Sequence, residues 1–110
     1  MENENLYPIT SKDLNDKKAS LAPKNIDTWR KFSKTVFEEG ALSQKTKQLI
    51  AVASAHITQC PYCIRAHTKQ AMRQGASKEE IMEAIWIATE MRAGAAYAHA
   101  TIAMDEMDKS

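Results

Sequence analysis

The stretch from Gln59 to His67 limits the fold most, because it fixes where one helix begins. Proline is tolerated in the first turn of a helix, where its missing N–H leaves no hydrogen bond unmade. Pro61 therefore predicts a helix start, with Cys60 at or next to the N-cap and Cys63 in the first turn. His67 then follows Cys63 by one turn on the same helix face.

Cys60 and Cys63 are the only two cysteines of the chain. A helix N-terminus carries partial positive charge and stabilises a thiolate, so both thiols are predicted to be more acidic than a free cysteine. Paired thiols of low pKa, with the titratable His67 one turn away, are what reversible thiol–disulfide chemistry requires. This chemistry is the interpretation that the spacing favours.

Three other interpretations of the cysteines stay open. They can be small buried apolar residues, as free cysteines often are. They can also form half of a zinc site completed by His56 and His67, although zinc sites usually take their ligand pairs from separated segments and no second CxxC or HxxxH exists here. A purely structural disulfide is disfavoured in a chain with no secretory signal. His56 itself is typical of a histidine that packs at a helix C-terminus, with at most an accessory role in a site.

Composition indicates one all-helical domain. Gly and Pro number only three each among 110 residues, while good helix formers such as Ala, Lys, Glu, Met and Gln are plentiful. Lys plus Arg total 15 against 14 for Asp plus Glu, so nothing points to nucleic acid or to a membrane surface. No apolar run approaches the length of a membrane span, and a reducing cytoplasm is the expected compartment. In that compartment a CxxC motif is more often catalytic than structural.

The chain is predicted to form five to six antiparallel helices joined by short loops. Residues 1–22 are expected to be an N-terminal arm with a short helix capped by Ser11, and residues 23–110 the main domain. Within that domain we expect helices over 23–39, 44–59, 61–74 and 77–107, the last kinked or broken at 92–94. The capping box that begins with Ser77 marks the start of the last helix.

Two of these helices are expected to be largely buried. The helix over 23–39 carries one apolar stripe, and the helix over 44–59 turns apolar on most faces towards its end. Small residues in the last segment, such as Gly94 and Ala100, permit close helix–helix approach within or between subunits. The apolar stripe of the helix over 23–39 consists of Ile26, Trp29, Phe32, Val36 and Phe37.

Five short motifs follow one another along the chain: Gly40-Ala41-Leu42-Ser43, Lys47-Gln48-Leu49-Ile50-Ala51, Cys60-Pro61-Tyr62-Cys63-x-x-x-His67, Gly75-Ala76-Ser77-x-Glu79-Glu80-Ile81 and Arg92-Ala93-Gly94. In their order and spacing the chain resembles the AhpD-like alkylhydroperoxidase / carboxymuconolactone decarboxylase family, over about residues 29–104. The CxxCxxxH core is specific in this helical setting, whereas the flanking pieces are individually weak.

The resemblance implies an all-α, AhpD-like helical bundle, often trimeric or hexameric, with the CxxC motif near a subunit interface. Enzymatic members are thiol peroxidases. In them the second cysteine, here Cys63, attacks the peroxide, and the first, here Cys60, resolves it to a disulfide. The histidine, here His67, belongs to a proton relay that deprotonates the attacking thiol. The decarboxylase branch of the family does not use the CxxC motif, so its presence argues against that reaction.

The sequence departs from the family pattern at two positions. Family enzymes usually carry a glutamate twelve residues before the first cysteine, where this chain has Gln48. An amide cannot accept a proton, so Gln48 can orient His67 or a water but cannot strengthen the base through charge. The best-known peroxidase of the family has histidine just before the second cysteine, where this chain shares Tyr62 with many relatives.

The sequence and the resemblance together predict a peroxiredoxin-type thiol peroxidase that reduces hydrogen peroxide or small alkyl hydroperoxides through a Cys60–Cys63 disulfide. No metal or cofactor is expected, only an external reductant, either a small thiol or a thiol protein. The alternative is a dithiol–disulfide exchange or redox-responsive module without peroxidase turnover, less favourably one that binds zinc.

Overall fold

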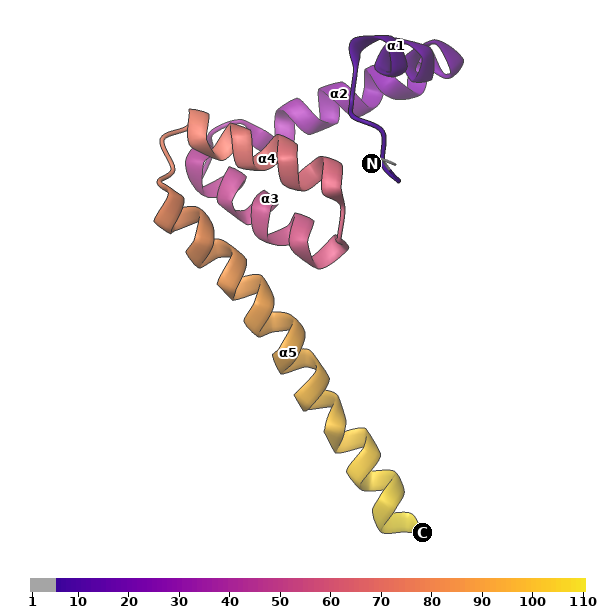
Figure 1. The fold of residues 1–110 in the computed structure, drawn as a ribbon, viewed down its shortest axis with the longest axis vertical. Coiled ribbons are helices and arrows are strands. Elements are labelled where there is room, and N and C mark those ends of the chain that lie inside the picture. Colours follow the sequence, from indigo (N-terminus) through magenta and orange to yellow (C-terminus); the bar gives the residue numbers. More distant parts are fainter. Residues whose placement is uncertain (1–5) are drawn as a thin grey trace. The chain divides into compact units, whose positions relative to one another are not determined.

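The structure, a computed structural model, describes residues 6–110, and this part of the chain contains five α-helices and no strand. The all-α prediction is thus confirmed. The helices are α1 (Lys12–Leu21), α2 (Pro23–Phe37), α3 (Gln44–Thr58), α4 (Pro61–Arg73) and α5 (Lys78–Lys109) (Figure 1). Of the helices in residues 6–110, none combines the length and the apolar character that crossing a bilayer would require.

The chain divides into two compact units, one ending at Gln44 and the other formed by Lys45–Ser110. The domain boundary predicted between residues 22 and 23 stays a prediction. In the first unit, the short helix predicted after Ser11 is present as α1. The Ser11 side chain caps it by accepting a hydrogen bond from the Leu14 N–H at 3.2 Å. Residues 1–5 of the predicted arm lie outside the described residues.

Helix α2 begins at Pro23, as predicted, and ends at Phe37, two residues earlier than expected. Its aromatic stripe is partly formed, since the rings of Trp29 and Phe32 lie with centroids 5.7 Å apart. The expectation that this stripe is buried is not met within this unit, where α2 contains no buried residue. The physical reason is that α1, the other helix of this unit, offers few apolar side chains to cover it.

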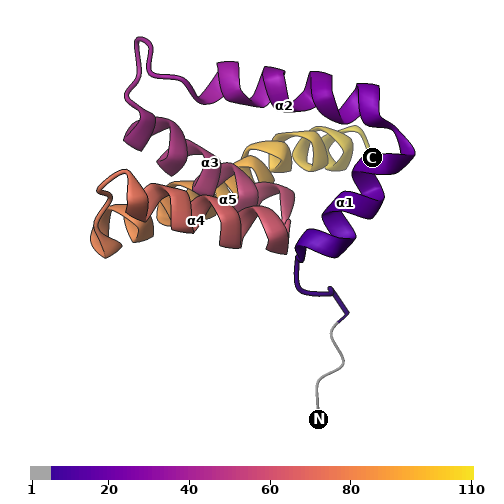
Figure 2. The same ribbon diagram turned by 90° about the horizontal axis from the view of Figure 1, so that it is seen from above.

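The second unit is built on a small core to which α3, α4 and α5 all contribute. Helices α3 and α4 lie side by side and run in opposite directions (Figures 1 and 2). The core cluster consists of Val52, Ala71, Ala76 and Ile81, with Leu49 and Ile85 packed against it. Val52 comes from the middle of α3, Ala71 from the last turn of α4 and Ile81 from the first turn of α5, and their packing places polar groups of α3 beside α4.

Helix α4 ends in the way its sequence predicts, with Gly75 just past the last helical turn. Gly75 has a φ of 90°, which favours a residue without a Cβ. The Ala76 N–H donates to the Ala71 carbonyl at 2.9 Å, and the Gly75 N–H donates to the Met72 carbonyl at 3.0 Å. This pair of bonds is the Schellman motif, and it turns the chain sharply towards α5.

Helix α5 starts at the predicted capping box, in which Ser77 and Glu80 each accept a hydrogen bond from the other's backbone N–H. The predicted kink or break at residues 92–94 is wrong, because α5 is a single helix from Lys78 to Lys109. Gly94 lacks a Cβ but keeps its N–H, so it costs only about 1 kcal/mol relative to alanine. The alanines on both sides of Gly94 are the strongest helix formers and carry the helix through it.

Candidate dithiol site

Cys60 occupies the junction between α3 and α4 and serves the ends of both helices. Gln59, just before it, has a φ of 58°, the left-handed conformation that commonly follows a helix. The Cys60 N–H donates to the Ala55 carbonyl at 3.1 Å and so closes the C-terminus of α3. The Cys60 carbonyl accepts the first backbone bond of α4, from the Ile64 N–H at 3.0 Å. The main chain therefore holds Cys60 from both sides.

The side chain of Cys60 is the N-cap of α4. Its Sγ accepts a hydrogen bond from the backbone N–H of Cys63 at 3.2 Å. The prediction that Cys60 lies at the N-cap and Cys63 in the first turn is confirmed. The Cys63 side chain and the Cys63 N–H, both donating to this sulfur, hold the pKa of the Cys60 thiol below its ordinary value.

Cys63 differs from the prediction that both thiols are unusually acidic. Its pKa is raised, first because its side chain donates to the Cys60 sulfur and then because it is partly buried. A negative charge on Cys60 also disfavours a second one on Cys63, as expected of two acids that share a site. The first proton to leave the reduced pair therefore leaves a thiolate on Cys60, with Cys63 as its hydrogen-bond donor.

His67 of α4 and Gln48 of α3 meet across the interface between these helices. The His67 Nδ1 lies 2.8 Å from the Gln48 Oε1. Gln48 is the one buried polar residue recorded among residues 6–110, with 9% of its surface exposed. Burial lowers the pKa of His67, so its imidazole is neutral at neutral pH. The two residues lie 19 positions apart in sequence, and only the antiparallel packing of α3 and α4 brings them together.

The other predicted site residues have more local roles in the geometry. His56 lies near the C-terminus of α3, and its Nδ1 donates to the Val52 carbonyl at 2.8 Å. This bond matches the expected packing role at a helix end. Tyr62 acts on the site through its backbone, whose N–H also lowers the pKa of Cys60.

The donor groups are not arranged as the zinc alternative requires. Among the residues that the structure describes, no group of three or more His, Cys, Asp or Glu side chains is placed to hold a metal ion. The set of four ligands drawn from Cys60, Cys63 and the two histidines is therefore not assembled.

Sequence reasoning gave Arg92 no place at the site. Its Nη1 donates to the Ile57 carbonyl at 2.9 Å, linking α5 to the last turn of α3 just before Cys60. Arg92 appeared in the sequence only as part of a motif shared with the family, next to a glycine that suggested a kink. A second link is the ion pair of 2.7 Å between Lys45 and Glu80, which joins the first turns of α3 and α5.

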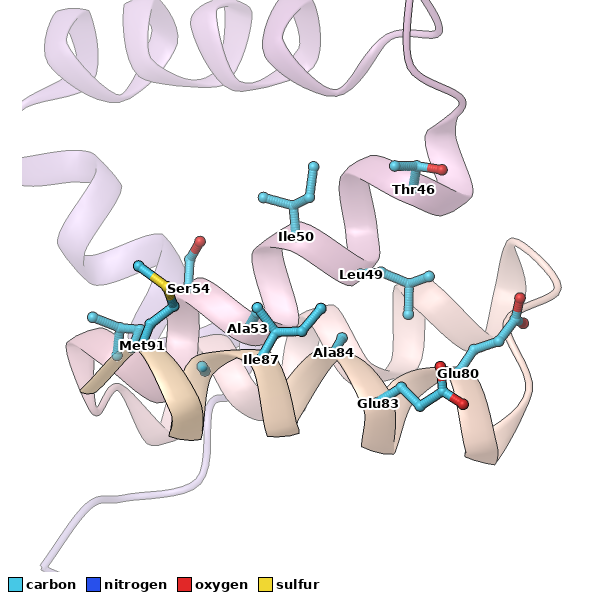
Figure 3. Close-up of a pocket in the computed structure, with 12 residues that line it drawn as sticks. Thr46, Leu49, Ile50, Ala53, Ser54, Glu80, Glu83, Ala84, Ile87 and Met91 are labelled. Carbon is cyan, nitrogen blue, oxygen red and sulfur yellow. The ribbon is translucent and has the colours of Figure 1, made fainter. Parts of the chain in front are cut away.

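An apolar groove of about 500 Å³ runs between α3 and α5. Leu49 and Ala53 of α3 face Ala84 and Ile87 of α5 across it (Figure 3). Helix α3 thus has two distinct faces, since Gln48, Val52 and Ala55 are buried and do not line this groove. None of the lining residues is a cysteine or a histidine. The groove residues are Thr46, Leu49, Ile50, Ala53, Ser54, Ile57, Glu80, Glu83, Ala84, Ile87, Ala88 and Met91.

Solved structures resemble this chain in fold and in sequence. A carboxymuconolactone decarboxylase family protein from Legionella pneumophila is 29% identical with a TM-score of 0.70, and the match covers 88% of this chain and 87% of that one. A Thermotoga maritima protein, described as a "carboxymuconolactone decarboxylase family protein possibly involved in antioxidative response", is 27% identical with a TM-score of 0.56. That match covers 74% of this chain and 94% of the T. maritima chain.

Sequence comparison agrees with these structural likenesses. "Uncharacterized protein 4 in cox locus" of Paracoccus denitrificans is 61% identical over 83 residues, which cover 76% of this chain and 75% of that protein. The model of the carboxymuconolactone decarboxylase family matches residues 23–106, a span that includes the dithiol, His67 and Gln48. The chain therefore belongs to the carboxymuconolactone decarboxylase family, with its AhpD-like all-helical fold.

Proposed function

We propose that this protein is a thiol-dependent peroxidase that reduces hydrogen peroxide or small alkyl hydroperoxides. The observation that carries the proposal is the pair of cysteines in one turn at the N-terminus of α4, where the Cys63 N–H donates to the Cys60 sulfur and the two thiols have opposite pKa shifts. His67 stands one turn beyond Cys63 and is held by Gln48. The suggestion of an antioxidative role for the T. maritima relative is consistent with this chemistry.

The proposed reaction needs both sulfurs. The Cys63 sulfur, after passing its proton to His67, attacks one peroxide oxygen, so that an S–O bond forms and the O–O bond breaks. The alkoxide or hydroxide that leaves takes a proton from the site. The Cys60 thiolate then attacks the sulfenic acid sulfur, and hydroxide leaves as water once it is protonated. Two electrons pass from the two sulfurs to the peroxide, and an external thiol or thiol protein returns them in a reducing compartment such as the cytoplasm.

The pKa shifts divide these roles. A raised pKa means that Cys63 needs a positioned base before it can attack, and His67, one turn further along the same helix face, is the titratable group to which we assign this role. A lowered pKa means that Cys60 is ready as a thiolate for the second step, in which no further base is needed.

One observation favours a second candidate, dithiol–disulfide exchange with protein or small-molecule disulfides. Cys60, not Cys63, holds the thiolate of the reduced pair, and in exchange the more acidic thiol attacks first. The amide of Gln48 also provides no carboxylate to strengthen His67. In this reaction Cys60 forms the mixed disulfide, and Cys63 releases the product.

Single-turnover oxidation tests the proposal. The reduced protein is mixed with one equivalent of cumene hydroperoxide or hydrogen peroxide, and thiols and intact mass are followed in time. We expect loss of both thiols and a mass lower by two hydrogen atoms. The Cys60→Ser variant should gain one oxygen at Cys63 instead, and Cys63→Ser should react slowly.

Turnover separates the two candidates. With excess dithiothreitol, a peroxidase consumes hydroperoxide continuously, and the Cys63→Ser variant does not. An exchange module instead reduces a small disulfide such as oxidised glutathione through Cys60. It consumes hydroperoxide no faster than the uncatalysed reaction does. That second pattern would contradict the peroxidase proposal.

A further inference from the structure

The turn between α3 and α4 is held by its own chain and by a side chain of α5. Within the turn, the Cys60 N–H donates to the Ala55 carbonyl at 3.1 Å, and the Thr58 Oγ1 donates to the same carbonyl at 3.3 Å. From α5, the Arg92 Nη1 donates to the Ile57 carbonyl at 2.9 Å, across 35 positions of sequence. Carbonyls of a last helical turn have no partner within their helix, so each of these bonds fills an otherwise open position.

Gln59, inside this turn, has a backbone conformation that few side chains favour. Its φ is 58°. In this left-handed region the Cβ of an L-residue crowds the backbone, which is why glycine commonly occupies it. A strained residue of this kind persists where the surrounding structure holds it. The same conformation reverses the chain, so that Cys60 closes α3 with its N–H and caps α4 with its sulfur.

Pro61 explains why a donor from another helix suits this turn. In a continuing α-helix the Ile57 carbonyl would accept from the N–H of residue 61, and proline has none. Arg92 supplies the missing donor. A guanidinium stays charged and carries several N–H groups, so one of them can bond the carbonyl while the others remain in water. Arg92 therefore fixes the last turn of α3 directly before the strained Gln59.

We propose that Arg92 is a positioning residue of the dithiol, which holds the last turn of α3 and thereby keeps Gln59 left-handed and Cys60 in place as the cap of α4. The groups that lower the pKa of Cys60 belong to Cys63 and Tyr62 in the first turn of α4. Arg92 therefore acts on the thiol through the main chain rather than through its own charge. A part of this positioning in peroxide turnover rests on the proposed function, whereas its effect on the thiol is a property of the reduced protein.

Alkylation of the reduced protein tests the positioning role. If the turn loosens, the Cys60 sulfur loses part of its bond from the Cys63 N–H, and the pKa of Cys60 rises. Because only the thiolate reacts, Arg92→Met should slow the alkylation of Cys60 by iodoacetamide at pH 7 about threefold and move its pH profile upward. Arg73→Met makes the same change at an exposed position at the other end of α4 and should leave both unchanged. A wild-type rate and pH profile in Arg92→Met would overturn the proposal.

A substitution at Gln59 separates this role from a general effect on stability. Glycine adopts a positive φ freely, so in Gln59→Gly the turn depends less on Arg92. In a double-mutant cycle, Arg92→Met should therefore slow the alkylation of Cys60 less in the Gln59→Gly background than in wild type. Equal effects in the two backgrounds would overturn the proposal. Should Arg92→Met not fold, Arg92→Lys takes its place, since lysine keeps the charge without the guanidinium geometry, and the same outcomes decide.

Peroxide kinetics test the part that rests on the proposed function. In that reaction Cys60 captures the sulfenic acid of Cys63, so a displaced Cys60 should leave the sulfenic acid longer-lived. With one equivalent of cumene hydroperoxide, Arg92→Met should form the sulfenic acid and convert it to the disulfide about threefold more slowly than wild type. Conversion at the wild-type rate would overturn this role of Arg92. If no form of the protein reacts with hydroperoxide, the peroxidase function fails, and the alkylation rates still decide whether Arg92 positions Cys60.

Discussion

Arg92 of α5 donates a hydrogen bond from its Nη1 to the carbonyl of Ile57, in the last turn of α3, across 2.9 Å. Carbonyls of a last helical turn have no partner within the helix and carry partial negative charge, so a guanidinium suits this place well. Thr58 ends α3 one residue later, and Cys60 follows. This contact therefore braces the turn that carries the more acidic of the two thiols.

Replacing this arginine should loosen the turn. We expect Arg92→Gln to lower the free energy of unfolding by about 1 kcal/mol, the usual contribution of such a hydrogen bond. Urea unfolding followed by circular dichroism measures it. Lys69→Gln, which removes the same charge from an exposed position on α4, is the matched control. Equal stability of the two variants would mean that the Arg92 contact contributes nothing.

The hydrogen bond between the thiols predicts an effect of each cysteine on the other. Cys60 raises the pKa of Cys63, through the hydrogen bond first and through its charge as well. We therefore expect Cys60→Ser to lower the pKa of Cys63 relative to wild type, because a serine carries no charge at neutral pH. The pH dependence of iodoacetamide alkylation, read by mass spectrometry, measures it.

The reciprocal variants complete this test. Cys63→Ala removes the side-chain donor to Cys60, so the pKa of Cys60 should rise, whereas Cys63→Ser keeps a donor and should change it less. In wild type the first thiol to be alkylated at pH 7 should be Cys60. Faster alkylation of Cys63 than of Cys60 would contradict the order of the two pKa values.

Gln48→Glu should speed peroxide reduction. A carboxylate beside the imidazole raises the pKa of His67 and makes it a stronger base. A positioned base contributes about 10²–10⁴-fold to a rate, and we expect a gain at the low end, because the site has not been shaped around a charge. The second-order rate between pH 6 and 9 measures it, with the exposed Gln74→Glu as the control for added charge. A slower reaction would mean that repulsion between the carboxylate and the thiolate dominates.

Stability should fall on acidification in two separate steps. Burial depresses the pKa of His67 below 6.5 in the folded protein. On acidification the unfolded chain therefore takes up a proton at this residue before the folded protein does, and stability is lost as the pH drops below about 6.5. Glu80 has a pKa below its ordinary 4.5 because Lys45 and the Ser77 N–H donate to it, so its contribution is lost only at lower pH.

Urea midpoints between pH 3.5 and 8 can separate these two steps. His67→Gln should reduce the loss of stability between about pH 5 and 7. Glu80→Gln should reduce the loss of stability below about pH 4.5. His99→Gln controls for the removal of an imidazole from an exposed position. A wild-type slope that survives unchanged in His67→Gln would show that another group is responsible.

The exposed apolar side chains predict a homo-oligomer, as the family resemblance does. Trp86 and Ile87 of α5 are each 64% exposed and Tyr97 is 84% exposed, more apolar surface on one helix than a monomer usually leaves to water. We expect light scattering at micromolar concentration to give a trimer or a hexamer, and Ile87→Lys to shift it to smaller species. A wild-type monomer under these conditions would contradict this prediction.

Helix starts were the features most readily predicted from sequence. Pro61 and the capping box at Ser77 act within about four residues of the chain. The conformation of these two helix starts therefore depends on the local sequence alone. The kink expected at Gly94 failed for a related reason. A glycine alone removes no hydrogen bond, and the surrounding alanines determine the outcome.

The site itself could be predicted only in part. The spacing of Cys60, Cys63 and His67 gave their common helix, and the resemblance pointed to Gln48. The opposite pKa shifts of the two thiols could not be predicted, because they depend on which sulfur accepts the N–H at the helix start. Arg92 was missed because its partner is a backbone carbonyl, which has no signature in the sequence.

The use of a sulfur as the cap of α4 links the redox state of the protein to the mechanics of one helix. The Cys60 sulfur accepts the Cys63 N–H most strongly as a thiolate, and a disulfide sulfur is a far weaker acceptor. Oxidation should therefore loosen the first turn of α4 and leave the end of α3 intact, because that end is closed by the Cys60 backbone alone. By thermodynamic reciprocity, any contact that stabilises that first turn, including one from a neighbouring subunit, makes the Cys60–Cys63 disulfide a stronger oxidant. The same coupling would let a contact far from the sulfurs tune how readily the pair is reduced.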